Sequence, residues 1–177
     1  CEELKKTALT IKDNTGKAGF TFPTDSGWLL MSMAWSFGLD YMEQIDGKWT
    51  ATFDSPEMIN FLQYVSDLKW KDNVLPENIL LAVKDVQQLV ATDQAAFAYA
   101  PSDWSSNLIS AYGMSKDNIS NSPVVAGPAG ACTQIGGDIW MISPDTTSEQ
   151  MDAIFKWLDL RGHGLKMDDA TVERLKG

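Results

Sequence analysis

The chain has 177 residues, of which 44% are hydrophobic and 21% are charged, a composition typical of a globular protein. Its formal net charge is −10 at pH 7, and without Lys/Arg clusters this argues against binding to nucleic acid or an anionic membrane surface. The length suffices for one large domain or two small lobes. No run of apolar residues is long enough to cross a membrane, and Cys1 and Cys132 lack the spacing of a metal site.

The first third of the chain predicts helices, a short strand and a hairpin. In order, we expect a helix that ends near Thr10, a turn over 12–17, a strand over 19–22 and a buried helix over 28–38. Asp46-Gly47 lies between alternating residues, which predicts a β-hairpin over 42–53. Ser55 followed by Pro56 is typical of a helix start, with Ser as the N-cap and Pro at the first position.

The remaining pattern alternates short helices with apolar strands. We expect a helix over 85–90, a strand over 95–99, a helix over 103–112, strands over 121–126 and 138–142, a helix that follows 146–149, and the start of another helix over 168–176. Thr146 and Glu149 have the spacing of a capping box. The fold class is therefore α/β, rich in helices around a small mixed sheet.

The most informative segment joins the strand over 95–99 to the helix that follows it. Ser102, Asp103 and Trp104 place a hydroxyl, an acid and a flat aromatic ring at this junction. Sugar sites use such groups, because pyranose C–H faces stack on aromatic rings while acids and amides bind the hydroxyls. Two plainer roles stay open: Trp104 is also suited to a core, and Asp103 to capping the helix.

A second segment repeats this theme further along the chain. Gly136 and Gly137 allow a close approach of backbone to a ligand, and Asp138 follows them directly, with Trp140 nearby. A hinge or a bulge is an alternative role for the two glycines. Trp28, in the first turn of the expected buried helix, suits either the core or a binding cleft.

Enzymatic function is not favoured by these residues. Asp103 and Asp138 are conceivable as a glycosidase-type carboxylate pair, but no Glu lies at a strand end in a stacked aromatic setting, and His163 lies far from any nucleophile motif. We therefore expect a binding protein rather than an enzyme, with no metal or organic cofactor. An interaction domain that binds protein through its Trp-rich surface is the alternative.

The order of these pieces resembles the extracellular solute-binding proteins of ABC sugar importers, the maltodextrin-binding-protein-like family. The resemblance rests on Leu9-Thr10 to Gly19-Phe20, Trp28 to Gly38, Asp54-Ser55-Pro56-Glu57, Leu68-Lys69-Trp70 to Leu75-Pro76, Gln94-Ala95-Ala96-Phe97, Trp104, Pro128, Gly136-Gly137 and the helix over 148–158. It implies a truncated part of a periplasmic-binding-protein-like (type II) fold: residues 1–135 from the C-terminal lobe, and residues 136–177 from the hinge crossing plus a strand and helix of the N-terminal lobe.

The resemblance also implies what the protein binds and where it acts. It implies capture of a mono- or oligosaccharide in a cleft between two lobes, followed by delivery to ABC permease subunits outside the cytoplasm, with a parent protein anchored by lipid. The resemblance implies that the ligand contacts Ser102, Asp103, Trp104, Gly136, Gly137, Asp138 and Trp28. A homodimer, formed through a surface that truncation exposes, and a disulfide between Cys1 and Cys132 both stay open.

Overall fold

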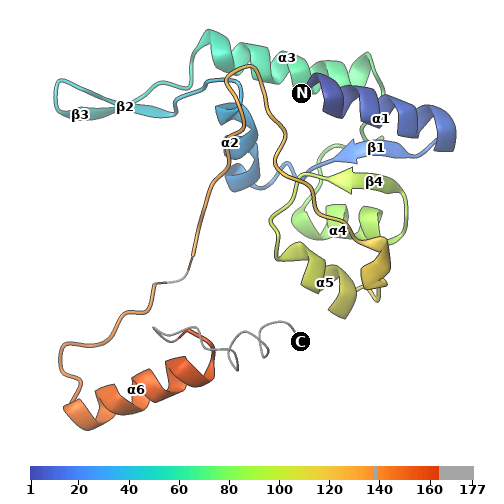
Figure 1. Ribbon diagram of the computed structural model, residues 1–177. Coiled ribbons are helices and arrows are strands. Elements are labelled where there is room, and N and C mark those ends of the chain that lie inside the picture. Colours follow the sequence, from blue (N-terminus) through green and yellow to red (C-terminus); the bar gives the residue numbers. More distant parts are fainter. Residues whose placement is uncertain (138, 164–177) are drawn as a thin grey trace. The chain divides into compact units, whose positions relative to one another are not determined.

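The computed structural model describes residues 1–137 and 139–163, and its contacts divide the chain into two compact units, Cys1–Ile135 and Gly136–Gly177. Figure 1 shows the elements of the first unit, which are α1 (Glu2–Thr15), β1 (Ala18–Thr21), α2 (Gly27–Trp35), β2 (Met42–Ile45), β3 (Lys48–Ala51), α3 (Pro56–Trp70), α4 (Val83–Ala91), β4 (Ala95–Ala98), α5 (Trp104–Ser110) and a 3-10 turn at Lys116–Asn118. The second unit contains α6 (Ser148–Leu160). No helix in the described ranges is long and apolar enough to cross a membrane.

The centre of the first unit is a pair of parallel strands, in which Phe20 of β1 lies opposite Phe97 of β4. All four residues of β1 are buried, so its side chains pack on both faces of the pair, as expected for a parallel sheet. Figure 1 shows α1 on one side of these strands and α4 and α5 on the other. The larger core cluster includes Leu4, Ala8 and Phe20, and the smaller one includes Val86 and Trp104.

The hairpin predicted by Asp46-Gly47 is confirmed and forms a sheet of its own. β2 and β3 pair antiparallel, and Asp46 and Gly47 take the positive φ values, 50° and 77°, that this tight turn needs. Within the described residues the chain therefore has two separate two-stranded sheets instead of one small mixed sheet. The helix-rich α/β class is confirmed.

Helix boundaries follow local capping chemistry. Ser55 accepts a hydrogen bond from the backbone N–H of Met58, and Pro56 begins α3, as the sequence predicts. The turn expected over 12–17 is wrong, because α1 continues to Thr15. Gly16 ends that helix with φ 73°, a left-handed conformation that glycine adopts without strain.

The strand predicted over 121–126 is wrong, and so is the described part of the strand predicted over 138–142. Neither segment is assigned to a strand, and an isolated bridge between Gly127 and Gly130 is the extended pairing nearest to the first of them. A strand needs a neighbour for its N–H and C=O groups, and no strand in the described ranges runs beside either segment. The helix predicted over 168–176 lies outside the described residues.

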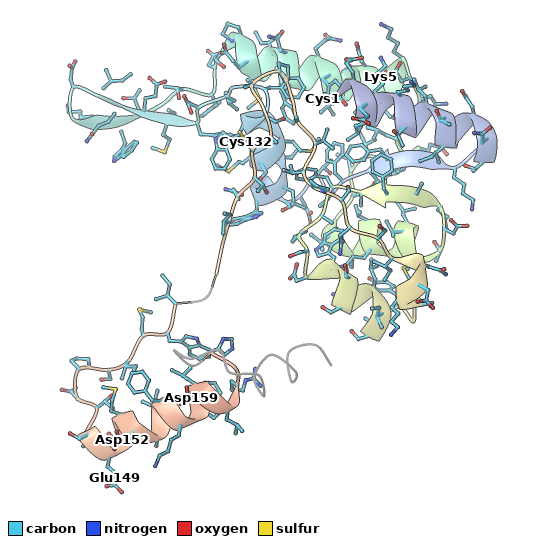
Figure 2. The ribbon with its side chains drawn as sticks, viewed as in Figure 1. Cys1, Lys5, Cys132, Glu149, Asp152 and Asp159 are labelled. Carbon is cyan, nitrogen blue, oxygen red and sulfur yellow. The ribbon has the colours of Figure 1, made fainter. Side chains whose placement is uncertain are left out.

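The second unit is built on α6. Thr147 accepts a hydrogen bond from the backbone N–H of Gln150, whose side chain accepts one in return, so the capping box lies one residue later than the sequence predicts. Trp140 packs edge-on against Trp157, with ring centroids 5.3 Å apart. The acidic residues Glu149, Asp152 and Asp159 are spread along this helix (Figure 2).

Candidate ligand-binding site

The candidate site lies at the carboxyl ends of β1 and β4. Since these strands are parallel, the loop from β1 to α2 and the loop from β4 to α5 leave the same edge of the pair. Ligands of open α/β folds bind at this edge, where loops and helix N-termini converge. The fold therefore places Trp28 and the segment 102–104 at one edge, although they are far apart in the sequence.

The two predicted tryptophans differ sharply in exposure. Trp28, in the first turn of α2, is 49% exposed, whereas Trp104, the first residue of α5, is 8% exposed. Trp104 packs with Leu29, Leu81 and Val86, so little of its ring surface is available to a ligand in this conformation. Since Leu29 follows Trp28 directly, the same cluster supports the helix turn that presents the exposed ring.

Ser102 and Asp103 are both exposed beside Trp104. Asp103 occupies the N-cap position of α5, but its side chain makes no capping hydrogen bond. The Asp103 carboxylate therefore does not cap α5, although the sequence left capping open as an alternative to ligand binding. The positive end of the α5 dipole lies next to this acid.

Buried polar groups near this edge were not predicted from the sequence. The Thr21 hydroxyl and the Gln134 side-chain oxygen are buried without a hydrogen-bond partner among the described residues, and the buried Tyr99 hydroxyl interacts with the hydroxyls of Ser32 and Thr133. Ser32 donates to the Trp28 carbonyl at 3.2 Å and accepts from the Gln134 N–H at 3.2 Å, which ties the segment around Gln134 to α2. Buried polar groups are nearly always paired, so the Thr21 hydroxyl and the Gln134 oxygen are atoms to which a polar ligand or water would bind.

The environment of Tyr99 fits this description. Burial raises the pKa of its hydroxyl above the ordinary value of 10.0, while the nearby hydroxyls of Thr133 and Ser32 lower it to a smaller extent. Tyr99 therefore carries its proton at neutral pH and is able to donate a hydrogen bond. The sequence does hold a signal for Tyr99, because this residue directly follows the apolar strand β4. Thr21 has the corresponding position at the end of β1.

The loop after β1 is held in place by its neighbours. The Thr24 hydroxyl donates to the Ile79 carbonyl at 2.9 Å and accepts from the Leu81 N–H at 3.1 Å. The buried ammonium of Lys69 donates to the carbonyls of Pro76 and Glu77 at 2.7 and 2.8 Å. These bonds fix the segment 76–81 against the loop that precedes Trp28, so that side of the site is preorganised.

The other predicted contacts lie elsewhere. Gly136 and Gly137 belong to the second unit and are exposed, and Asp138 lies outside the described residues. Cys1 and Cys132 are both free cysteines; Figure 2 labels both. Within the described ranges no group of three or more His, Cys, Asp or Glu side chains is placed to hold a metal ion.

Comparison with solved structures defines the class of fold. The chain is similar to a maltose-bound MalE3 of T. maritima, with a TM-score of 0.68 and 24% sequence identity over 92% of this chain and 44% of that one. The fold is thus periplasmic-binding-protein-like, and the chain spans less than half the length of the structure it matches.

Comparison with protein families identifies the chain itself. Residues 2–160 match the model of the bacterial extracellular solute-binding proteins, and the chain belongs to this family. The resemblance stated from the sequence is confirmed, and membership implies a location outside the cytoplasm. No curated protein matches the sequence.

Proposed function

We propose that this chain contributes one side of a carbohydrate site, at the carboxyl edge of β1 and β4, in a solute receptor for ABC-transporter uptake. The observation that carries the proposal is the half-exposed Trp28 at the same edge as the buried Tyr99 hydroxyl and the buried, unpartnered polar atoms of Thr21 and Gln134. An aromatic face beside hydroxyl and amide groups suits the alternating apolar and polar surface of a sugar. The maltose in the similar structure supports this ligand class.

The formal net charge of −10 supports a neutral ligand over an anionic one, because a negative surface repels anions. We assign Trp28 the stacking role and Ser102 and Asp103 the role of binding sugar hydroxyls. Trp104 belongs to the same buried cluster as Leu29 and so supports the helix turn that carries Trp28. We also propose that Gly136, Gly137 and Asp138 contact the sugar, as the resemblance implies.

The mechanism is capture rather than catalysis. Residues 1–135 form part of a C-terminal lobe, and residues 136–177 supply the crossing and elements of the N-terminal lobe. In the whole protein, sugar bound between two lobes favours the closed form over the open one. The closed form then docks on permease subunits. Lipid anchoring of the parent protein and a homodimer of this chain stay predictions, and sedimentation velocity tests the second.

Isothermal titration calorimetry with maltose and a panel of mono- and oligosaccharides tests the site. We expect saturable binding by the 177-residue chain, and no release of reducing sugar from an oligosaccharide. Trp28→Ala is expected to weaken binding roughly five- to tenfold, which corresponds to a stacking contribution of about 1 kcal/mol. Tyr99→Phe is expected to weaken binding by a similar factor, because one hydrogen bond contributes about 1 kcal/mol.

Trp49→Ala is the matched control, since Trp49 is a 66% exposed tryptophan on the hairpin. It is expected to bind sugar as the unmodified chain does. Equal affinities for the Trp28 and Trp49 variants would show that the sugar does not bind at this edge. Heat from anionic solutes alone would contradict the ligand class.

A further inference from the structure

The segment that leads out of the first unit is held against α2 at two points. Residues 127–134 run beside this helix (Figure 1), and the division between the two units falls directly after Ile135. Ser32 and Ser36 lie one turn apart on α2 and are both buried, at 2% and 3% exposure, so they share one face of the helix. Each serine accepts a hydrogen bond from a backbone N–H of this segment.

The first point of attachment lies just past the end of α2. The Ala129 N–H donates to the Ser36 carbonyl at 2.9 Å. Gly127 packs on the same carbonyl so closely that a Cβ atom at this position would lie 2.2 Å from its oxygen, and glycine is the residue that permits such an approach. The hydrogen bond joins two backbone groups, so it does not depend on a serine hydroxyl.

The second point of attachment is the Ser32 hydroxyl, which has three partners. It donates to the Trp28 carbonyl and accepts from the Gln134 N–H, at 3.2 Å in each case, and it interacts with the Tyr99 hydroxyl. A hydroxyl has one proton and two acceptor positions, so it is able to serve several partners at once. One buried hydroxyl thus joins Trp28 and Tyr99 of the candidate site to the backbone of the outgoing segment.

Gln134 is the last residue of this segment that the first unit encloses. Its side-chain oxygen is buried, whereas the next residue, Ile135, is 93% exposed. The Thr133 hydroxyl also interacts with the Tyr99 hydroxyl, so two consecutive residues of the segment contact the groups around Ser32. These contacts fix the place where the chain leaves the first unit.

We propose that Ser32 is a positioning residue, which links the sugar site at the edge of β1 and β4 to the place where the chain leaves the first unit. The sugar part of this inference rests on the proposed function. Sugar that orders Trp28 and Tyr99 also orders the hydroxyl between them, and this hydroxyl holds the Gln134 N–H. The element with two states is the hydrogen bond between Ser32 and Gln134, which is either made or broken. Linkage is reciprocal, so the bond favours sugar binding as much as sugar favours the bond.

Amide hydrogen exchange of the 177-residue chain, followed by NMR, tests the positioning role without sugar. We expect Ser32→Ala to speed exchange of the Gln134 N–H about fivefold or more, because this amide loses its acceptor. The Ala129 N–H is the internal control, since its acceptor is the Ser36 carbonyl, and its rate is expected to change by less than about twofold. Ser110→Ala, at an exposed serine at the end of α5, is the matched control variant and is expected to change neither rate.

Maltose, at a concentration that saturates the unmodified chain in calorimetry, tests the link to the sugar site. We expect maltose to slow exchange of the Gln134 N–H about fivefold or more in the unmodified chain and to leave that rate unchanged in Ser32→Ala. Protection that persists in Ser32→Ala would overturn the link, and so would the absence of protection in the unmodified chain.

The rates without sugar decide the positioning role separately. Equal acceleration at Ala129 and Gln134 in Ser32→Ala would overturn it, because a general loss of stability affects both amides. An unchanged rate at Gln134 would also overturn it. If the unmodified chain binds no sugar in calorimetry, the proposed function and the link to it are both refuted, whereas a Gln134 rate that rises alone still supports the positioning role.

Discussion

Replacement of Trp104 by alanine separates a structural role from a direct role in binding. The side chain is 8% exposed and packs with Leu29, Leu81 and Val86. Substitution of a buried tryptophan by alanine costs roughly 3–5 kcal/mol, since apolar burial is lost and a void remains. Trp104 also borders a large cavity, so part of its contact surface is already missing. We therefore expect the lower end of the range, about 3 kcal/mol.

Urea denaturation, followed by far-UV circular dichroism, measures this loss. With slopes of about 1–3 kcal/mol per molar urea, a loss of 3 kcal/mol lowers the midpoint by about 1–3 M. Trp70→Ala is the control, because Trp70 is 76% exposed, and its expected change is within about 0.5 kcal/mol. A Trp104→Ala loss below about 1 kcal/mol, together with strongly weakened sugar binding, would refute the packing argument and would show that this ring serves the ligand directly.

Three further predictions concern other parts of the molecule. Lys69→Met leaves the carbonyls of Pro76 and Glu77 without their donor and is expected to cost about 1–3 kcal/mol; an unchanged melting temperature would contradict this. Burial raises the pKa of Tyr99 above 10.0, so the folded state holds this proton more tightly than the unfolded state, and the associated stability is present below pH 10 and lost as the pH rises above it. Stability measured from pH 8 to pH 11 is expected to fall less steeply in Tyr99→Phe, and identical slopes would contradict the assignment. Thr147→Ala removes the side-chain bond to the Gln150 N–H and is expected to destabilise α6 by about 1 kcal/mol, measured as faster amide exchange over Ser148–Leu160, while Thr10→Ala in α1 leaves that exchange unchanged.

Local features were predictable because neighbouring residues decide them. Asp46-Gly47 makes a hairpin turn through its backbone conformation, and Ser55 begins α3 through one short-range hydrogen bond. These signals act over a few residues, so they are visible in the sequence. The order of such pieces along the chain was also enough to identify the family, which the match over residues 2–160 confirms.

The candidate site was predictable only in part. Ser102 and Asp103 were selected from the sequence by residue type and by their position after a strand, and Trp28 by its place in the first turn of the expected buried helix. Thr21, Tyr99 and Gln134 were missed, because a single hydroxyl or amide in an apolar segment has no distinctive pattern. Their importance comes from the burial of their polar groups, which is a property of the packed structure.

The sequence by itself determined the helix and turn signals, the acidic surface charge and the family. Tertiary structure decided which residues meet: it paired β1 with β4, buried Trp104 while leaving Trp28 half-exposed, and left residues 121–126 without a strand partner. The physical reason is the distance along the sequence between the groups that interact. Caps and turns are satisfied by groups a few residues away, whereas burial and strand formation require partners that are distant in sequence and that only the folded chain brings together.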